Sequence, residues 1–373
     1  MLKSIKYRWF IALVLLTVAL TAMAGCGGQA GEAPEGETPE SAAGGGDVSE
    51  GMTEGEDEME WGEPIPEGED PIRVVMLIIQ PFGSPFEGDL WQGIVKAKED
   101  GWASEIKLIE FKSPEEYEEG VRAVSEEYDL VIGTFELLKP AFETVAPDYP
   151  DTKYVNVWVQ APEPEEDYPN VRGYVYNVEH GSYINGVIAA RMCGDHVGFV
   201  GGDDNAVILR FFAGFEAGLK ATNPDIELSP AWAGDFNDPV KGRELGIRLF
   251  QEGAECIMTA ANKTGLGVIV AGQEVGKPIF GVDVDQSVDA PDTVISSALA
   301  NADFSGYQSI KDVVLDQWSG GTVYLGSDDG VSMVAINEDW RDGIPQDVLQ
   351  EAEEVEAKIA SGEIEVPETT DTR

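Results

Sequence analysis

The chain has few of the residues from which metal sites and nucleophilic active sites are built. Its 373 residues include two histidines and three cysteines. His180 and His196 lack partners at the spacing of metal ligands, so both are expected to be structural. No G-x-S-x-G, P-loop or G-x-G-x-x-G motif is present. The sequence therefore predicts no metal, no cofactor and no catalytic residue.

Basic residues are also scarce. The chain has 24 Lys and Arg against 70 Asp and Glu, which gives a formal net charge of -46. Binding to nucleic acid requires clustered Lys and Arg that neutralise phosphates, so this class of partner is excluded. The acidic excess is larger than one acidic segment explains, and we expect an acidic surface throughout.

A long apolar run, from Trp9 to Leu20, follows three basic residues and precedes a small-residue stretch that ends at Cys26. A basic region, an apolar region and small residues together predict a signal peptide over residues 1–26. The alternative is an uncleaved membrane anchor, but the run is shorter than the roughly 20 apolar residues that span a bilayer. In either case the rest of the chain is exported and tethered.

Residues 27–70 are rich in Gly, Glu, Pro and Ser, and no Lys or Arg occurs from Gln29 to Asp70. Such a segment buries too little apolar surface to offset the entropy of ordering it, and its like charges repel. We expect a disordered acidic tether that holds the folded part away from the membrane.

The folded part alternates short apolar strands with helical segments, which is typical of an α/β fold with parallel sheets. Two Rossmann-like lobes are expected, lobe 1 over residues 71–177 and lobe 2 over residues 178–284. Residues 285–320 are expected to return to lobe 1, and residues 321–373 to cross back to lobe 2 and end in a helix. Repeated crossings make a hinge, and the carboxyl ends of the parallel strands are expected to line a ligand cleft.

The stretch from Val197 to Gln286 contains GFVGG, RFFAGFEAGLKATNP, AGDFNDPVKG, TGLGV and GVDVDQ. In this order the motifs resemble the basic membrane protein family of bacterial lipoproteins, which includes PnrA-like nucleoside-binding components of ABC transporters. The segments from Val171 to Met192 and from Glu353 to Pro367 are similar to the family as well. The resemblance implies a type I periplasmic-binding-protein fold, an extracytoplasmic location at the cell membrane and an ABC permease as partner.

The resemblance also implies that the chain is cleaved before Cys26 and that this cysteine carries the lipid anchor. Cys193 and Cys256 then remain. Cys193 follows a helical run and Cys256 lies in an apolar strand, and we expect two free buried thiols rather than a disulfide.

Four aromatic residues are candidates for the walls of a ligand site. By resemblance, Phe86 in the loop after the first strand forms one wall of a slot for a nucleobase, whose flat face stacks on aromatic rings. The alternative is that Phe86 seals the lobe. Phe211, Trp232 and Phe236 are candidates for the opposite wall, whereas Phe212 and Phe215 are expected to face the core.

Polar candidates follow two strands of lobe 2. Asp283 ends a strand at the cleft edge, where its carboxylate can accept hydrogen bonds from two neighbouring sugar hydroxyls. Asn262 and Gly265 lie at the start of a helix, where amide groups can bind polar parts of a ligand. The alternatives are that Asp285 only caps a turn and that Thr264 only caps this helix.

Four positions depart from the family pattern. Pro140 and Ala300 stand where an Asp and a Lys are common, and Pro85 and Glu87 replace the Ser and Asn beside Phe86. A buried site that matches one ligand discriminates against another, so these changes favour a small polar ligand without fixing its identity. A surface receptor that signals to a membrane partner is the alternative to a transport protein.

Overall fold

The computed structural model describes residues 62–79, 82–329, 331 and 333–370. The predicted signal peptide, Cys26 and most of the predicted tether lie outside the described residues. Residues Trp61–Arg373 form one compact unit, and it contains two sheets. Within its described part, no helix is both long and apolar enough to cross a membrane.

The first sheet has six parallel strands. In sheet order they are β11 (Gly321–Leu325), β5 (Val171–Tyr176), β4 (Lys153–Val157), β3 (Leu130–Thr134), β1 (Ile72–Ile78) and β2 (Ala103–Glu110). Val74 to Ile78 of β1 are fully buried, as the continuous apolar sequence of this strand predicts for a strand covered on both faces.

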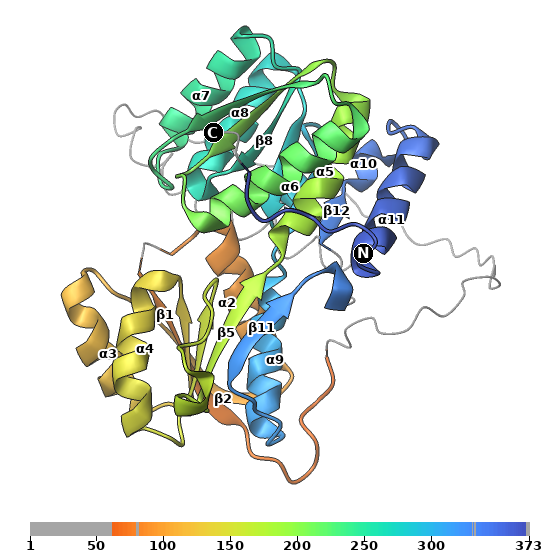
Figure 1. The fold of residues 1–373 in the computed structure, drawn as a ribbon. Coiled ribbons are helices and arrows are strands. Elements are labelled where there is room, and N and C mark those ends of the chain that lie inside the picture. Colours follow the sequence, from red (N-terminus) through yellow and green to blue (C-terminus); the bar gives the residue numbers. More distant parts are fainter. Residues whose placement is uncertain (1–61, 80–81, 330, 332, 371–373) are drawn as a thin grey trace, which may run out of the picture. The chain divides into compact units, whose positions relative to one another are not determined.

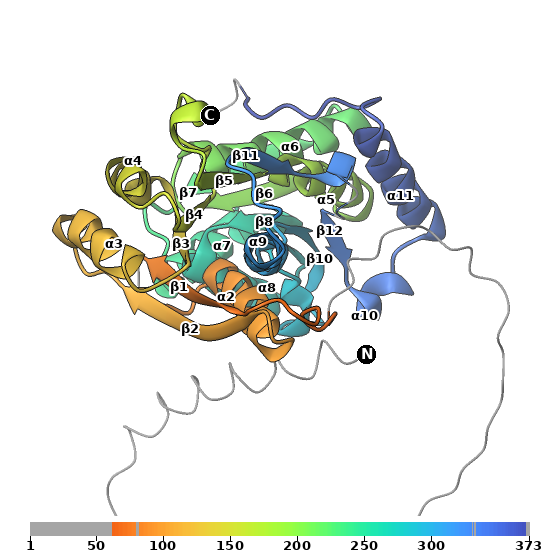
Figure 2. The ribbon, with the colours of Figure 1, turned by 90° about the horizontal axis from the view of Figure 1, so that it is seen from below.

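Four helices cover this sheet (Figure 2). On one face lie α2 (Pro85–Glu99) and α9 (Ala302–Val314), and on the other lie α3 (Tyr117–Ser125) and α4 (Lys139–Val145). Ser84 begins α2, because its side chain accepts a hydrogen bond from the Glu87 N–H. Phe86 therefore lies in the first turn of α2, although it was expected in the loop after the first strand.

The second sheet repeats this plan. Its strands, in sheet order, are β12 (Val334–Ile336), β10 (Val294–Leu299), β9 (Ile279–Asp283), β8 (Cys256–Ala260), β6 (His196–Gly201) and β7 (Glu227–Trp232). All pair in parallel except β12, which is antiparallel to β10. Without the edge strands β11 and β12, both sheets have the strand order 2-1-3-4-5 of open α/β folds. The predicted class, an α/β fold with two parallel-sheet lobes, is confirmed.

Helices also cover both faces of the second sheet. The pair α5 (Val178–Met192) and α6 (Ala206–Thr222) packs on one face, and the pair α7 (Pro239–Gln251) and α8 (Asn262–Val275) packs on the other. The short α10 (Glu338–Arg341) precedes α11 (Gln346–Ala360), which packs on α5. Asp238 caps α7 through the Lys241 N–H, as its position before Pro239 predicts.

The chain crosses between the sheets at Asn177, at residues 300–301 and again between β11 and β12. This corrects two expected boundaries. Strand β10 stays in the second sheet, although residues 285–320 were expected in lobe 1, and β11 belongs to the first sheet rather than to lobe 2 (Figure 1). Both strands are short apolar runs of the same kind, so their pattern does not say which sheet they join.

The end of the predicted tether is not a free segment. Ile65 packs against the core, and its N–H donates to the Asp100 carbonyl. The carbonyl of Glu63 accepts a hydrogen bond of 2.8 Å from the Trp102 indole. Residues 62–70 therefore lie against lobe 1, because this stretch, unlike most of the tether, contains an apolar side chain that can be buried.

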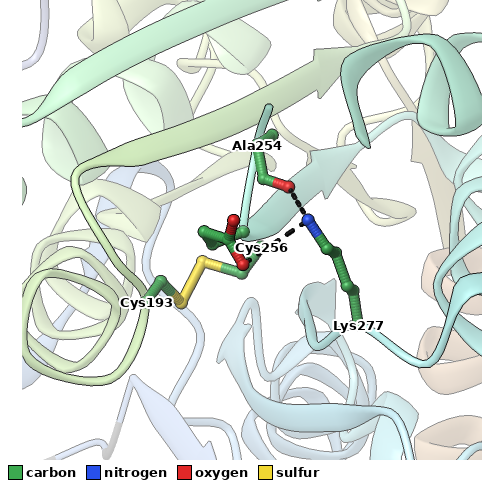
Figure 3. Close-up of a disulfide and its surroundings, with 5 residues drawn as sticks. Cys193, Ala254, Cys256 and Lys277 are labelled. Carbon is green, nitrogen blue, oxygen red and sulfur yellow. Dashed lines mark hydrogen bonds and ion pairs between the residues drawn. A yellow bond between two sulfur atoms is a disulfide. The ribbon is translucent and has the colours of Figure 1, made fainter. Parts of the chain in front are cut away.

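Cys193 and Cys256 form a disulfide, with their Cα atoms 5.9 Å apart (Figure 3). This corrects the expectation of two free thiols. Cys193 directly follows α5 and Cys256 opens β8, and α5 packs across the face of the sheet that contains β8. Nearby, Lys277 Nζ donates to the Ala254 carbonyl at 2.7 Å. The pairing follows from the packing of two elements 63 residues apart in sequence.

Candidate functional site

Unusual backbone conformations mark one edge of each sheet. Five non-glycine residues with positive φ lie at the carboxyl ends of strands or within two residues after them: Phe135 (66°), Trp158 (70°), Asn262 (50°), Asp283 (68°) and Asn301 (54°). The left-handed region is costly for residues that carry a Cβ, above all for Trp and Phe, and such strain concentrates at functional sites. These residues point to the carboxyl edges of the sheets as the site.

Polar atoms without a partner mark the same edges. Among the described residues, buried side-chain atoms of Thr134, Asn156, Thr259, Asn262 and Ser327 make no hydrogen bond. Thr134, Asn156 and Thr259 lie in the last two positions of β3, β4 and β8, and the other two follow β8 and β11 closely. Most buried polar atoms in folded proteins are paired, so this concentration indicates where a ligand can bind.

Asp283, Asn262 and Gly265 come together in one recess of lobe 2, which we call the Asp283 recess. It leaves no space that a water molecule could occupy, and it is lined by Pro85, Thr259, Ala261, Asn262, Gly265, Val282, Asp283 and Gln286. Pro85 comes from α2 of lobe 1, so both lobes contribute. Asp283, Asn262 and Gly265 are thus neighbours, and Thr259 and Gln286, which were not predicted, lie beside them.

Hydrogen bonds hold the Asp283 recess in shape. Gln286 Oε1 accepts from the Val282 N–H at 3.0 Å, and the Gln286 N–H donates to Ser297 Oγ at 3.1 Å. On the other side, the Ala300 N–H donates to the Asp283 carbonyl at 3.0 Å. Asp283 is therefore fixed at the end of β9 between two anchored segments. Asp285 accepts from the Ser287 N–H and caps a turn, as expected.

The start of α8 is held from the loop before α7. The Asp238 N–H donates to Thr264 Oγ1 at 3.0 Å, and Thr264 Oγ1 donates to the Asp235 carbonyl at 2.8 Å. Thr264 therefore binds a neighbouring loop, and the helix has no side-chain cap at its start. The alternative that Thr264 simply caps α8 is therefore wrong. Asn262 Oδ1, at the start of the same helix, has no hydrogen-bond partner.

Burial raises the pKa of Asp283 from 3.8 to about 7. The folded protein therefore holds a proton that the unfolded chain releases, so wild-type stability falls as the pH rises from about 4 to about 7. We expect Asp283→Asn to stabilise the protein, with a gain that grows by up to about 2.7 kcal/mol between pH 5 and pH 7. Urea unfolding of the wild type and the variant at pH 5 and pH 8 measures the difference in their free energies of unfolding. The exposed Asp225→Asn is the control, and parallel pH profiles for both variants contradict the expectation.

Aromatic side chains gather on the lobe 1 side. Ring centroids lie 5.8 Å apart for Phe86 and Phe135, 5.2 Å for Phe86 and Trp158, and 4.7 Å for Trp158 and Tyr176. Trp158 also reaches Phe211 of lobe 2, at 6.2 Å. These five residues form the interlobe aromatic cluster. Phe86 and Phe211 were predicted for opposite walls, and each contacts Trp158.

Trp158 was missed because it lies in an apolar run that is typical of one continuous strand. The strand ends at Val157, and the positive φ at Trp158 turns the chain out of the sheet. The apolar run YVNVWV continues through this point, so no signal in the sequence separates Trp158 from the strand.

The other two predicted aromatic residues lie beside β6. Trp232 packs on Phe199 and Phe212, at 5.8 Å each. A Cβ added at Gly202 would lie 2.2 Å from the Phe236 ring. Neither Trp232 nor Phe236 lines the Asp283 recess, and their contact with a ligand stays a prediction. Phe212 and Phe215 are fully buried, as expected.

The four departures from the family pattern fall in different places. Pro85 lines the Asp283 recess. Ala300 is fully buried, and its N–H donates to the Asp283 carbonyl. Glu87 is buried in the first turn of α2. Pro140 is exposed in the first turn of α4, six residues after β3 ends at Thr134.

A larger hollow, of about 440 Å³, lies at the opposite edge of the second sheet. Its lining includes Pro278 and Thr293, which directly precede β9 and β10, together with Lys277, Asp292 and Trp340. The strained residues and unpaired polar atoms described above are absent from its lining. The Asp283 recess is therefore the better candidate site.

Comparison with known proteins agrees with this architecture. Residues 72–370 match the family described as "ABC transporter substrate-binding protein PnrA-like". The chain is 30% identical over 309 residues to the CD4+ T-cell-stimulating antigen of Listeria innocua, covering 76% of this chain and 84% of that protein. It is 32% identical over 209 residues to basic membrane protein A2 of Borrelia garinii, covering 54% and 61%.

Solved structures show the same fold. A solute-binding protein of an ABC transporter system from Aeropyrum pernix K1 superposes with a TM-score of 0.72 at 27% identity, covering 81% of this chain and 95% of that chain. One from Conexibacter woesei superposes with a TM-score of 0.61 at 22% identity, covering 79% and 99%. The family match spans nearly all of the described residues, and this chain belongs to the PnrA-like family of ABC transporter substrate-binding proteins.

Proposed function

We propose that this substrate-binding protein is lipid-anchored on the extracytoplasmic face of the cell membrane. There it captures a nucleoside or a similar small polar ligand and presents it to an ABC permease. The N-terminal pattern that ends at Cys26 supports the anchor. The disulfide between Cys193 and Cys256 supports export, because disulfides persist mainly in oxidising compartments.

One observation carries the choice of ligand class. The Asp283 recess offers a carboxyl group, the Thr259 hydroxyl and the Asn262 Oδ1, and the last two have no partner. Nearby strand ends and the helices α2 and α6 supply the rings of the interlobe aromatic cluster. Hydrogen-bond acceptors for hydroxyl groups beside flat aromatic faces suit a molecule that combines a sugar with a ring.

The lobes already touch at points where a ligand would join them. Lys263 Nζ of α8 donates to the Phe82 carbonyl of lobe 1 at 3.4 Å, and Trp158 meets Phe211. The Asp283 recess leaves no space that a water molecule could occupy, whereas ordinary ligand pockets hold roughly 300–1,000 Å³, so a nucleoside requires the lobes to part. A ligand that contacts both lobes would then favour their closed arrangement.

A thermal-shift panel on the purified full-length chain tests the proposal. Purine and pyrimidine nucleosides, bases, sugars and amino acids are compared. A ligand at 100 times its Kd adds roughly 2.7 kcal/mol, which raises Tm by several degrees. We expect a shift with nucleosides that Asp283→Ala abolishes and the exposed Asp225→Ala keeps. A shift with sugars or amino acids alone would show that the ligand class is wrong.

A further inference from the structure

Thr259 carries a hydroxyl group that the rest of the protein does not use. It is the second-last residue of β8, it is 1% exposed, and its Oγ1 makes no hydrogen bond. Thr152, a second buried threonine, shows the ordinary arrangement, because its Oγ1 donates to the Ser125 carbonyl at 3.0 Å. A buried hydroxyl without a partner costs stability, and an apolar side chain of the same shape avoids that cost. The stability of the fold therefore does not explain the hydroxyl of Thr259.

A glycine keeps the space in front of this hydroxyl free. A Cβ added at Gly265 would lie 3.0 Å from Thr259 Oγ1, so a larger residue would crowd the hydroxyl. Both residues line the Asp283 recess, and so does Asn262, whose Oδ1 also has no partner. Thr259 and Asn262 therefore contribute two unpaired polar atoms to one recess.

Neither water nor the opposite lobe satisfies these two atoms while the lobes touch. The recess leaves no space that a water molecule could occupy, and the residue of lobe 1 that lines it is Pro85. Proline has no backbone N–H, so Pro85 offers a hydrogen-bond donor to neither atom. A partner for Thr259 and Asn262 therefore has to enter when the lobes part, which is the movement proposed above for the ligand.

We propose that Thr259 determines ligand specificity by forming a hydrogen bond with a hydroxyl group of the ligand, with Asn262 Oδ1 as the second partner of that group. A hydroxyl both accepts and donates, so it can accept from the Thr259 hydroxyl and donate to Asn262 Oδ1. A buried site that pairs with a hydroxyl discriminates against an analogue that lacks it. The ligand class is then a molecule with a free sugar hydroxyl, such as a ribonucleoside. This inference rests on the function proposed above and adds a residue that selects the ligand.

The first measurement needs no ligand. Thr259→Val removes the hydroxyl and keeps the shape of the side chain. We expect its Tm to equal or exceed that of the wild type, because no hydrogen bond is lost. Thr152→Val is the matched control, and its Tm should fall by several degrees because it loses the bond to the Ser125 carbonyl. An equal fall in both variants would overturn the inference, because Thr259 would then have a structural partner.

The second measurement tests the selection of a hydroxyl group. Adenosine and uridine, with the 2′-, 3′- and 5′-deoxy analogues of each, are titrated calorimetrically into the full-length chain. In the wild type, we expect the loss of one of these hydroxyls to weaken binding about tenfold or more. Thr259→Val should bind the parent nucleoside only as tightly as that analogue, and should bind the analogue as the wild type does. Thr152→Val should keep the discrimination of the wild type.

Gly265→Ala provides an independent check. It keeps the Thr259 hydroxyl but places a Cβ in front of it, so the same discrimination should be lost. If Thr259→Val binds a nucleoside as tightly as the wild type does, the inference is wrong and the proposed function stands. If neither adenosine nor uridine binds, the inference is also wrong, and the panel of nucleosides, bases, sugars and amino acids decides the proposed function by itself.

Discussion

Replacing Cys193 and Cys256 by alanine is expected to lower the free energy of unfolding by about 4 kcal/mol. The disulfide closes a loop of 63 residues. Closing such a loop removes conformational entropy from the unfolded chain, which accounts for a cost of about 4 kcal/mol. Both cysteines are buried, at 6% and 0% exposure, so loss of packing adds to the effect. Urea unfolding of the oxidised wild type and of the double variant measures the difference.

The single variants provide the control for this prediction. Cys193→Ala and Cys256→Ala each break the bond, so each should cost nearly as much as the double variant. A reducing agent should lower the stability of the wild type to about that of the double variant and leave the double variant unchanged. Small effects that add up across the two positions would instead mean that two independent thiols are present.

Replacing Arg210 by alanine is expected to cost about 3–5 kcal/mol of stability. In α6, Arg210 Nε donates to Glu179 Oε2 at 2.8 Å, and its guanidinium also donates to Asn177 Oδ1 at 3.0 Å. Glu179 is 2% exposed, so the variant leaves a buried carboxylate without its charged partner. Asn177 is the residue at which the chain first crosses between the sheets, so the pair also supports the hinge. Urea unfolding gives the cost.

An exposed ion pair of similar length is the matched control. Arg122 Nη1 lies 2.7 Å from Asp148 Oδ2, and the two side chains are 39% and 60% exposed. Arg122→Ala should cost less than about 1 kcal/mol, because water solvates the charge that is left. Adding Glu179→Gln to Arg210→Ala should recover part of the loss, since it removes the buried charge. If Arg210→Ala lowers the free energy of unfolding no more than Arg122→Ala does, the ion pair of Arg210 and Glu179 does not stabilise the protein.

The sequence predicted the features that depend on local pattern. The continuous apolar run at Ile72 predicted a doubly covered strand, and Val74 to Ile78 are fully buried. The Asp238-Pro239 pair predicted the start of α7. Asp283, Asn262 and Gly265 could be predicted as neighbours because the carboxyl ends of parallel strands meet at one edge of a sheet. In each case the information lies within a few residues of chain.

The tertiary structure alone decided the features that depend on distant parts of the chain. The disulfide requires the end of α5 to lie on β8. Trp158 joins the interlobe aromatic cluster because β4 ends at Val157, the residue before it, although the apolar run continues through both residues. Asp89 and Asp303 meet because α9 returns to pack beside α2, more than 200 residues later. Composition and spacing determine each strand and helix, whereas their assignment to sheets and the contacts across the hinge follow from how those elements pack.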